Sequence, residues 1–195
     1  MRICSLYSGS SGNCIYIGSE HTNVLIDVGV STKKIVEALH SIDIKPEELD
    51  AVLITHEHSD HIGGLGVFTR KYGIPVYGTN KTLEAVGQYK NLGKVDFSLF
   101  HGIKPEQSFS VNDIYVKAIS TWHDAADPVC YTLSDGDKKV SVATDLGDFD
   151  THMVQSLSGC DAMLIEANHD IRMLEVGPYP YILKKRIMGR YGHLS

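Results

Sequence analysis

The chain contains 195 residues, of which 43% are hydrophobic and 22% charged, a composition typical of a soluble globular protein the size of one ordinary domain. The 18 Lys and Arg residues against 24 Asp and Glu give a net charge of −6, which excludes a protein that coats nucleic acid or anionic membranes by bulk charge alone. No apolar stretch approaches ~18 residues, so we expect no membrane-spanning helix, no membrane partner and a cytoplasmic location.

The first half of the chain predicts strands that alternate with helices. Short apolar runs without a helical period predict strands over residues 2–7, 14–18, 23–28, 51–55 and 75–78. Apolar residues at helical spacing predict a helix that begins after Ser31 and helices over 64–72 and 80–89.

The second half is richer in strands. Strands are predicted over 97–100, 108–111, 114–120, 129–134, 139–144 and 161–166, and helices over 151–157 and 180–191. The Asp135-Gly136 pair indicates a hairpin. No linker, repeat or low-complexity tract divides the chain, so we predict a single α/β layered domain over residues 1–195.

The cysteine pattern indicates a reducing compartment. Cys4, Cys14, Cys130 and Cys160 are scattered and form no C-x-x-C pair. We therefore expect buried reduced thiols in a cytosolic protein, and neither a disulfide framework nor a zinc knuckle.

A dense cluster of metal-ligand residue types follows the predicted strand 51–55. The sequence His56-Glu57-His58-Ser59-Asp60-His61 has the form H-x-H-x-D-H. A tight loop after a strand can aim His56 and His58 at one ion and turn Asp60 and His61 toward a second point. Imidazole and carboxylate ligands suit Zn, Mn or Fe. The alternative is a solvated histidine-rich loop.

Two more residues of these types follow predicted strands. His123 lies directly after the strand 114–120, and Asp145 directly after the strand 139–144. Each by itself is explained as a surface histidine or a turn-forming aspartate. The cluster, His123 and Asp145 share one arrangement. In each case residues of metal-ligand type follow the end of a predicted strand, where several loops can converge.

This order of motifs resembles the metallo-β-lactamase fold hydrolases. The resemblance implies an αββα sandwich with a two-metal site along one edge. It also implies that His56, His58 and His123 hold the first metal, that Asp60 and His61 hold the second, and that Asp145 bridges the two.

Shorter motifs over essentially the whole chain resemble the YycJ/WalJ-like branch of that family. They are SGSSGN (8–13), D-P-x-C-Y (127–131), T-D-L-G (144–147), I-E-A-N-H-D (165–170) and G-H-L-S (192–195). The branch implies a metal-dependent DNA exonuclease, related in fold to ribonuclease Z. The family's final histidine ligand, on a strand near its C-terminus, has no counterpart here, so we expect a sandwich that lacks its C-terminal segment and a second metal site one protein ligand short.

The resemblance also implies a mechanism. A metal-bound hydroxide at a dinuclear site would attack a phosphodiester of a nucleic acid, with DNA as the expected substrate. Asp60 would be both ligand and proton carrier. His193, whose G-H-L-S context resembles a family motif beside the substrate phosphate, or His169 would contact the substrate or protonate the leaving group, and for both a purely structural role is the alternative.

Two further segments suit an anionic ligand. The loop Ser8–Asn13 could turn backbone N–H groups toward a phosphate, or form a flexible turn. The basic residues Lys184, Lys185, Arg186 and Arg190 could hold a nucleic-acid backbone, or form a solvated helix face.

Two other functions remain open from the sequence. One is a small-molecule hydrolase, such as a thioesterase or lactonase, which the acidic net charge favours because a nuclease is expected to present basic surface. The other is a non-catalytic, metal-stabilised signalling or scaffold protein. The sequence carries no signal for an oligomeric state.

Overall fold

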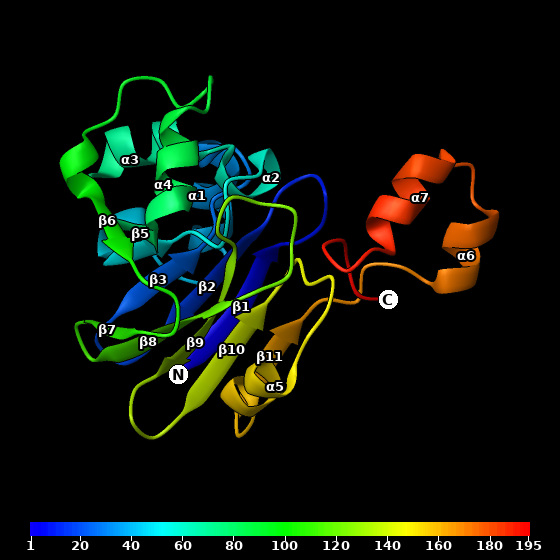
Figure 1. Cartoon of the computed structure of the whole chain (residues 1–195). Helices are drawn as coiled ribbons and strands as arrows, with labels where there is room; N and C mark the ends of the chain where they lie inside the picture. Colours follow the sequence, from blue (N-terminus) through cyan, green and yellow to red (C-terminus); the bar gives the residue numbers. More distant parts are fainter.

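Two β-sheets packed face to face form the centre of the molecule (Figure 1), which is described by a computed structural model of residues 1–195. The strands of the first sheet, in spatial order, are β1 (Arg2–Tyr7), β2 (Cys14–Gly18), β3 (Asn23–Ile26), β4 (Ala51–Leu53), β5 (Val76–Thr79) and β6 (Phe100–Ile103). Those of the second sheet are β11 (Ala162–Ile165), β10 (Lys139–Ala143), β9 (Val129–Ser134), β8 (Ile114–Ser120) and β7 (Ser108–Val111).

The direction of the strands decides which ends share an edge. β3, β4, β5 and β6 run parallel to one another, whereas β1, β2 and β3 are joined antiparallel. In the second sheet β7 to β10 form an antiparallel meander, and β11 is parallel to β10. β8, β10 and β11 therefore point the same way.

Helices cover the outer faces of both sheets (Figure 1). The first sheet is covered by α1 (Thr32–His40), α3 (Leu65–Tyr72) and α4 (Asn80–Gly87), and the second by α5 (Thr151–Leu157). The short α2 (Ser59–Ile62) follows β4, and two 3-10 turns span Pro46–Glu48 and Phe97–Leu99. This αββα order confirms the sandwich that the sequence predicted.

The side chains of β2 show why the strands are continuously apolar. Ile15 and Ile17 belong to the core between the sheets, whereas Cys14 and Tyr16 belong to the core beneath the helices. A strand covered on both faces buries every side chain, so its sequence loses the apolar–polar alternation. Tyr131, which is fully buried, donates its hydroxyl to the carbonyl of Ile54 at 2.8 Å and joins the two sheets.

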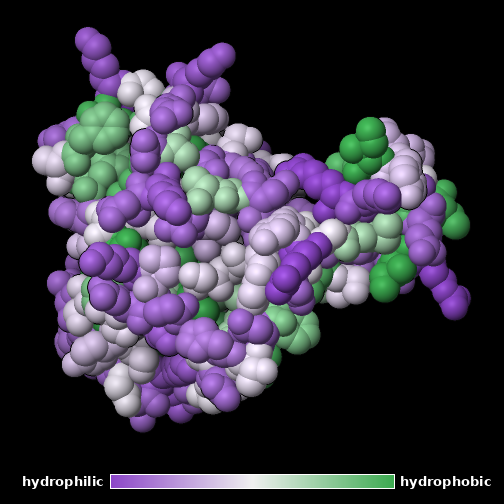
Figure 2. All heavy atoms as spheres, viewed as in Figure 1, coloured by the Kyte–Doolittle hydropathy of each residue, from purple (hydrophilic) through white to green (hydrophobic).

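The chain between β11 and the C-terminus leaves the sandwich as an arm that carries α6 (Ile171–Val176) and α7 (Tyr181–Ile187) (Figure 1). Hydrophobic side chains lie on its surface (Figure 2), among them Met173, Val176 and Ile182, which are 73%, 85% and 83% exposed. The two ends of the arm lie together, because the Asn168 N–H at its start donates to the carbonyl of Leu194 at its end, at 2.9 Å.

Two predicted elements differ most from the structure, and one helix was not predicted. Residues 97–99 form a 3-10 turn, and the strand begins at Phe100, because the Asp96 carboxylate accepts the Ser98 N–H and closes the turn. The predicted helix 180–191 ends at Ile187, before Gly189. α6 precedes this helix and was not predicted, because it is too short for its periodicity to be visible. It is capped by Asp170, whose side chain accepts the Met173 N–H.

The four cysteines are free, but only two are fully buried. Burial raises the pKa of the Cys130 thiol to about 12, and burial together with the charge of Asp27 raises that of Cys14 still more. Cys4 and Cys160 are half-buried, which corrects the prediction of four buried thiols. Cys4 lies on the edge strand β1, and Cys160 lies in the turn between α5 and β11. None of the helices has the length and apolar character needed to cross a bilayer.

Leu53 tests the core between the sheets, because its side chain is fully buried there. Leu53→Ala is expected to lower the free energy of unfolding by about 2–5 kcal/mol, through lost burial and the cavity that remains. Urea denaturation measures the change. Val67→Ala, at a side chain 51% exposed on α3, is the control and should change stability by no more than about 0.5 kcal/mol. Equal losses in both variants would contradict this assignment of the core.

Candidate metal centre

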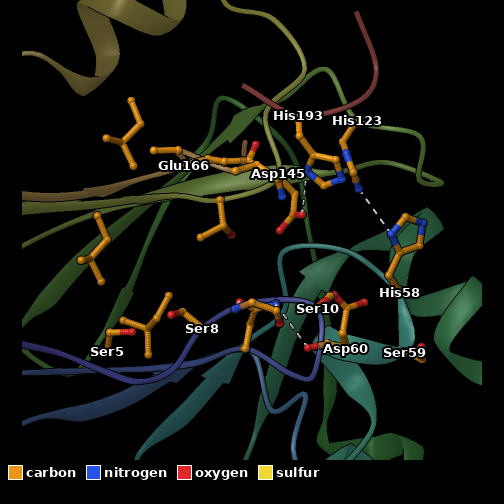
Figure 3. Close-up of a pocket in the computed structure, with 18 of the residues that line it drawn as sticks. Ser5, Ser8, Ser10, His58, Ser59, Asp60, His123, Asp145, Glu166 and His193 are labelled. Carbon is orange, nitrogen blue, oxygen red and sulfur yellow. Dashed lines mark hydrogen bonds and ion pairs between the residues drawn. The ribbon is translucent and has the colours of Figure 1, made fainter. Parts of the chain in front are cut away.

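A cavity of about 670 Å³ opens where strands of both sheets end (Figure 3). The parallel strands β3 and β4 end just before Asp27 and His56. In the second sheet, β8, β10 and β11 end before His123, Asp145 and Glu166, respectively. The predicted convergence of strand ends is therefore present, and it draws on both sheets.

The first donor group consists of His56, His58 and His123, whose candidate ligand atoms lie within 4.8 Å of one another. Nε2 of His58 lies 3.2 Å from the carbonyl of Asp124, and Nδ1 of His123 lies 3.1 Å from the carbonyl of Gly192. Because a carbonyl only accepts, these nitrogens carry the protons. The lone pairs of His58 Nδ1 and His123 Nε2, which are 3.3 Å apart, therefore face each other.

His56 completes this group from the protein interior. Its Nδ1 lies 3.0 Å from the hydroxyl of Thr55, which itself donates to Asp27 at 2.8 Å, so Nδ1 of His56 is the donor in its pair. Its Nε2 is buried and has no hydrogen-bond partner. A buried polar atom without a partner is costly. Three converging imidazole lone pairs, one of them otherwise unpaired, fit a divalent metal ion.

The second donor group consists of His56, His61 and Asp145. Nε2 of His61 lies 3.1 Å from the Asp145 carboxylate and 3.7 Å from that of Asp60. Asp60 lines the cavity but stands outside the three compact donor groups. Asp60 and His61 both belong to α2, so part of the predicted loop is a short helix.

Gly29 allows α2 to lie against the loop after β3. Asn13 N–H donates to the carbonyl of Asp60 at 2.7 Å, and Val28 N–H to that of His61 at 2.8 Å. A Cβ at Gly29 would stand 1.7 Å from the Asp60 carbonyl oxygen. Any other residue at this position would push α2, with Asp60 and His61, out of place.

Asp27 orients His61 and was not identified from the sequence. Its side chain is fully buried and accepts hydrogen bonds from His61 Nδ1 (2.7 Å), Thr55 N (2.9 Å) and Thr55 Oγ1 (2.8 Å). With Nδ1 engaged, His61 turns Nε2 toward the Asp145 carboxylate, as a metal-ligating histidine requires. The signal that could have revealed Asp27 is the one used for Asp145: an aspartate at a strand end. Both have a positive φ, 60° and 56°.

A third donor group, His123, Asp145 and His193, involves the returning C-terminal segment. Nδ1 of His193 lies 2.7 Å from the Glu166 carboxylate and 3.4 Å from that of Asp145 (Figure 3). A Cβ at Gly147 would stand 2.2 Å from the carbonyl oxygen of Arg190, so this glycine lets the segment approach. Glu166 was part of a motif in the sequence but had no role there.

Burial and neighbouring charges set the protonation of the site. Burial, followed by the nearby His61, holds the pKa of His56 well below its ordinary value, which keeps the ring neutral and able to bind a cation. Burial also lowers the pKa of His123. Although burial alone would lower the pKa of His61, the carboxylates of Asp27 and Asp145 outweigh it and raise that pKa.

His169 is the one predicted site residue that lies apart from the others. It is half-buried, belongs to none of the donor groups and does not line the cavity. The chain turns into the arm at this point, and Asn168 is the last cavity residue before the turn. His193, by contrast, lines the cavity.

Asp27→Asn tests how His61 is held. An amide at this position loses the carboxylate that accepts the Nδ1 proton of His61, so the affinity for Mn²⁺ is expected to fall about 10–100-fold. Isothermal titration calorimetry measures this. Asp43→Asn is a matched control, because Asp43 is exposed and has nearly the same backbone, with φ 62°. Unchanged Mn²⁺ affinity in Asp27→Asn would refute the role of Asp27.

Similarity to known proteins agrees with this geometry. The family described as "Beta-lactamase superfamily domain" matches residues 22–194. The chain is 44% identical to exodeoxyribonuclease WalJ of Streptococcus pneumoniae and 35% identical to exodeoxyribonuclease YycJ of Bacillus anthracis. Each match covers 97% of this chain and 71% of the relative.

Solved structures share the fold at low identity. The metallo-β-lactamase fold protein YhfI from Bacillus subtilis matches with a TM-score of 0.65 and 17% identity, over 83% of this chain and 69% of that one. Zn²⁺-bound PqqB from Methylobacterium extorquens matches with a TM-score of 0.70 and 16% identity, over 86% and 64%. The chain therefore belongs to the β-lactamase superfamily, as a metal-dependent hydrolase with the metallo-β-lactamase fold and WalJ and YycJ among its relatives.

Proposed function

We propose that this chain is the catalytic domain of a metal-dependent exodeoxyribonuclease, formed by residues 1–195 and acting with two divalent cations. The observation that carries the chemistry is the pair of donor groups that share His56 beside an open cavity. DNA as the substrate is supported by the activity for which the WalJ and YycJ relatives are named. Zinc, manganese and iron all suit these imidazole and carboxylate donors.

The ligand assignment takes the first donor group whole, takes His61 and Asp145 from the second, and adds Asp60, whose carboxylate lies 3.7 Å from Nε2 of His61. His56, His58 and His123 would hold the first ion, Asp60 and His61 would hold the second, and Asp145 would contribute to both. The lone pairs of the three histidines of the first group, and the 3.1 Å separation of Asp145 from His61, support this assignment. When bound, the two ions would lower the pKa of a shared water and neutralise charge on the phosphodiester.

Two side chains of the cavity are placed to move protons. The side chain of Asp60 is 31% exposed at the edge of the cavity, where it can accept the proton of the attacking water. His193 is held by Glu166 and can donate a proton to the leaving deoxyribose oxygen. Glu166 is itself fixed by the Leu146 N–H at 2.7 Å, so it acts as a positioning residue.

His58→Ala tests the function itself. Loss of one of three donors of the first group is expected to abolish degradation of a 5′-labelled DNA duplex in Mn²⁺, measured on a sequencing gel together with metal content. His40→Ala, at an exposed histidine of α1, should keep full activity. If the metal-loaded wild-type protein leaves DNA and RNA intact yet cleaves a thioester or lactone, the nuclease proposal is wrong.

The dependence on salt separates a nuclease from a small-molecule hydrolase. A protein that contacts several phosphates loses affinity steeply as salt rises, because bound counterions are released. Cleavage of a neutral lactone involves no such release. A flat salt profile of kcat/KM on DNA would therefore speak for the small-molecule hydrolase.

His193→Gln tests whether His193 acts as a proton donor or as a metal ligand. We expect kcat on DNA to fall about 10²–10⁴-fold, the usual contribution of general acid catalysis. The loss should be much smaller on thymidine 5′-(p-nitrophenyl phosphate), whose leaving group needs no proton. Metal content is the second readout. A drop in metal affinity, with equal losses on both substrates, would instead make His193 a ligand.

A further inference from the structure

Arg186 is the one lysine or arginine side chain that lines the cavity. The other members of the basic run are engaged elsewhere. Lys184 donates to the carbonyl of Glu175 at 2.6 Å, the ammonium of Lys185 lies 5.0 Å from the ring centre of Tyr181, and Arg190 pairs with Asp148 at 3.0 Å. The structure thus distinguishes one residue within a run that the sequence could only treat as a whole.

Arg186 is anchored beside the first donor group. Its Nε donates to the Asp124 carboxylate at 2.6 Å, and the other oxygen of Asp124 lies 3.5 Å from Nε2 of His123. Nη1 and Nη2 of Arg186 make no hydrogen bond to the protein, and the side chain is 55% exposed. One edge of the guanidinium is therefore fixed, and the other is available to a ligand.

The remaining charges of the cavity explain why this edge suits an anion. Three carboxylates line it, those of Asp60, Asp145 and Glu166. The divalent ions would offset their charge at the reacting phosphate but not at its neighbours along a polynucleotide. A phosphate next to the reacting one thus finds no lysine or arginine side chain in the cavity other than Arg186. Guanidinium and phosphate also match in geometry, through two parallel hydrogen bonds.

We propose that Arg186 forms a phosphate subsite, in which the free edge of its guanidinium binds the backbone phosphate adjacent to the scissile one. The inference rests on the proposed function, because it assumes a polynucleotide in the cavity. Asp124 is the positioning residue that holds Arg186, and through it the α6–α7 arm is joined to the loop that carries His123. The arm thereby brings the only arginine or lysine side chain to a cavity that is lined by three carboxylates.

The test measures binding separately from cleavage. A fluorescent single-stranded oligonucleotide with phosphorothioate linkages, which resist hydrolysis, is titrated with the Mn²⁺-loaded protein at several salt concentrations, and anisotropy gives Kd. Arg186→Gln is expected to weaken binding about tenfold, as for a lost charged hydrogen bond. The slope of log Kd against log salt should fall by about 0.7, the value for one phosphate contact on a single strand.

Two further variants make the outcome decisive. Arg186→Lys keeps the charge but not the fork, so it should keep the wild-type salt slope with a smaller loss of affinity. Lys185→Gln removes a charge from the same helix outside the cavity and should keep both slope and Kd. Wild-type slopes in Arg186→Gln, or a reduced slope in Arg186→Lys, would overturn the subsite. A wild-type protein that neither binds nor degrades DNA would instead overturn the proposed function.

Discussion

The buried carboxylate of Asp27 is the interaction on which the site depends. A charge without solvent is costly unless hydrogen bonds replace the lost water, and here three donors do so: the N–H and O–H of Thr55 and Nδ1 of His61. The same bonds fix the direction of two imidazoles, because the Thr55 hydroxyl that donates to Asp27 also accepts from His56. One buried group at the end of β3 thus orients ligands that follow β4.

The remaining donors are oriented by backbone carbonyls. Those of Asp124 and Gly192 each take the proton of one histidine nitrogen and leave the other nitrogen to face the shared space. Carbonyls and the Asp27 carboxylate thus pre-arrange lone pairs before any ion binds, which lowers the entropic cost of forming the site. The acidic net charge is compatible with the proposed anionic substrate, because divalent ions and Arg186 would offset the cavity carboxylates where that substrate would lie.

Much of the fold was visible in the sequence wherever a strand or helix is covered by its neighbours. β8 and β9 were predicted with their observed bounds, because their apolar runs end at polar turns. Prediction was wrong where local polar contacts set the bounds of an element. Asp96 closes a turn that displaces the start of β6, and the arm holds two short helices in place of one. Side-chain hydrogen bonds of this kind leave no periodicity in the sequence.

The sequence by itself determined which residues are available for the chemistry of this protein. The H-x-H-x-D-H cluster, together with His123 and Asp145 at strand ends, consists of residue types that bind a cation. Position along the chain sufficed, because the cluster follows β4, His123 follows β8 and Asp145 follows β10. Only the tertiary structure decided which polar residues support or join them. Glu166 and Arg186 line the cavity and the buried Asp27 holds His61, whereas His169 does not line the cavity. Pairing between strands and the return of the arm bring together residues that are far apart in the chain.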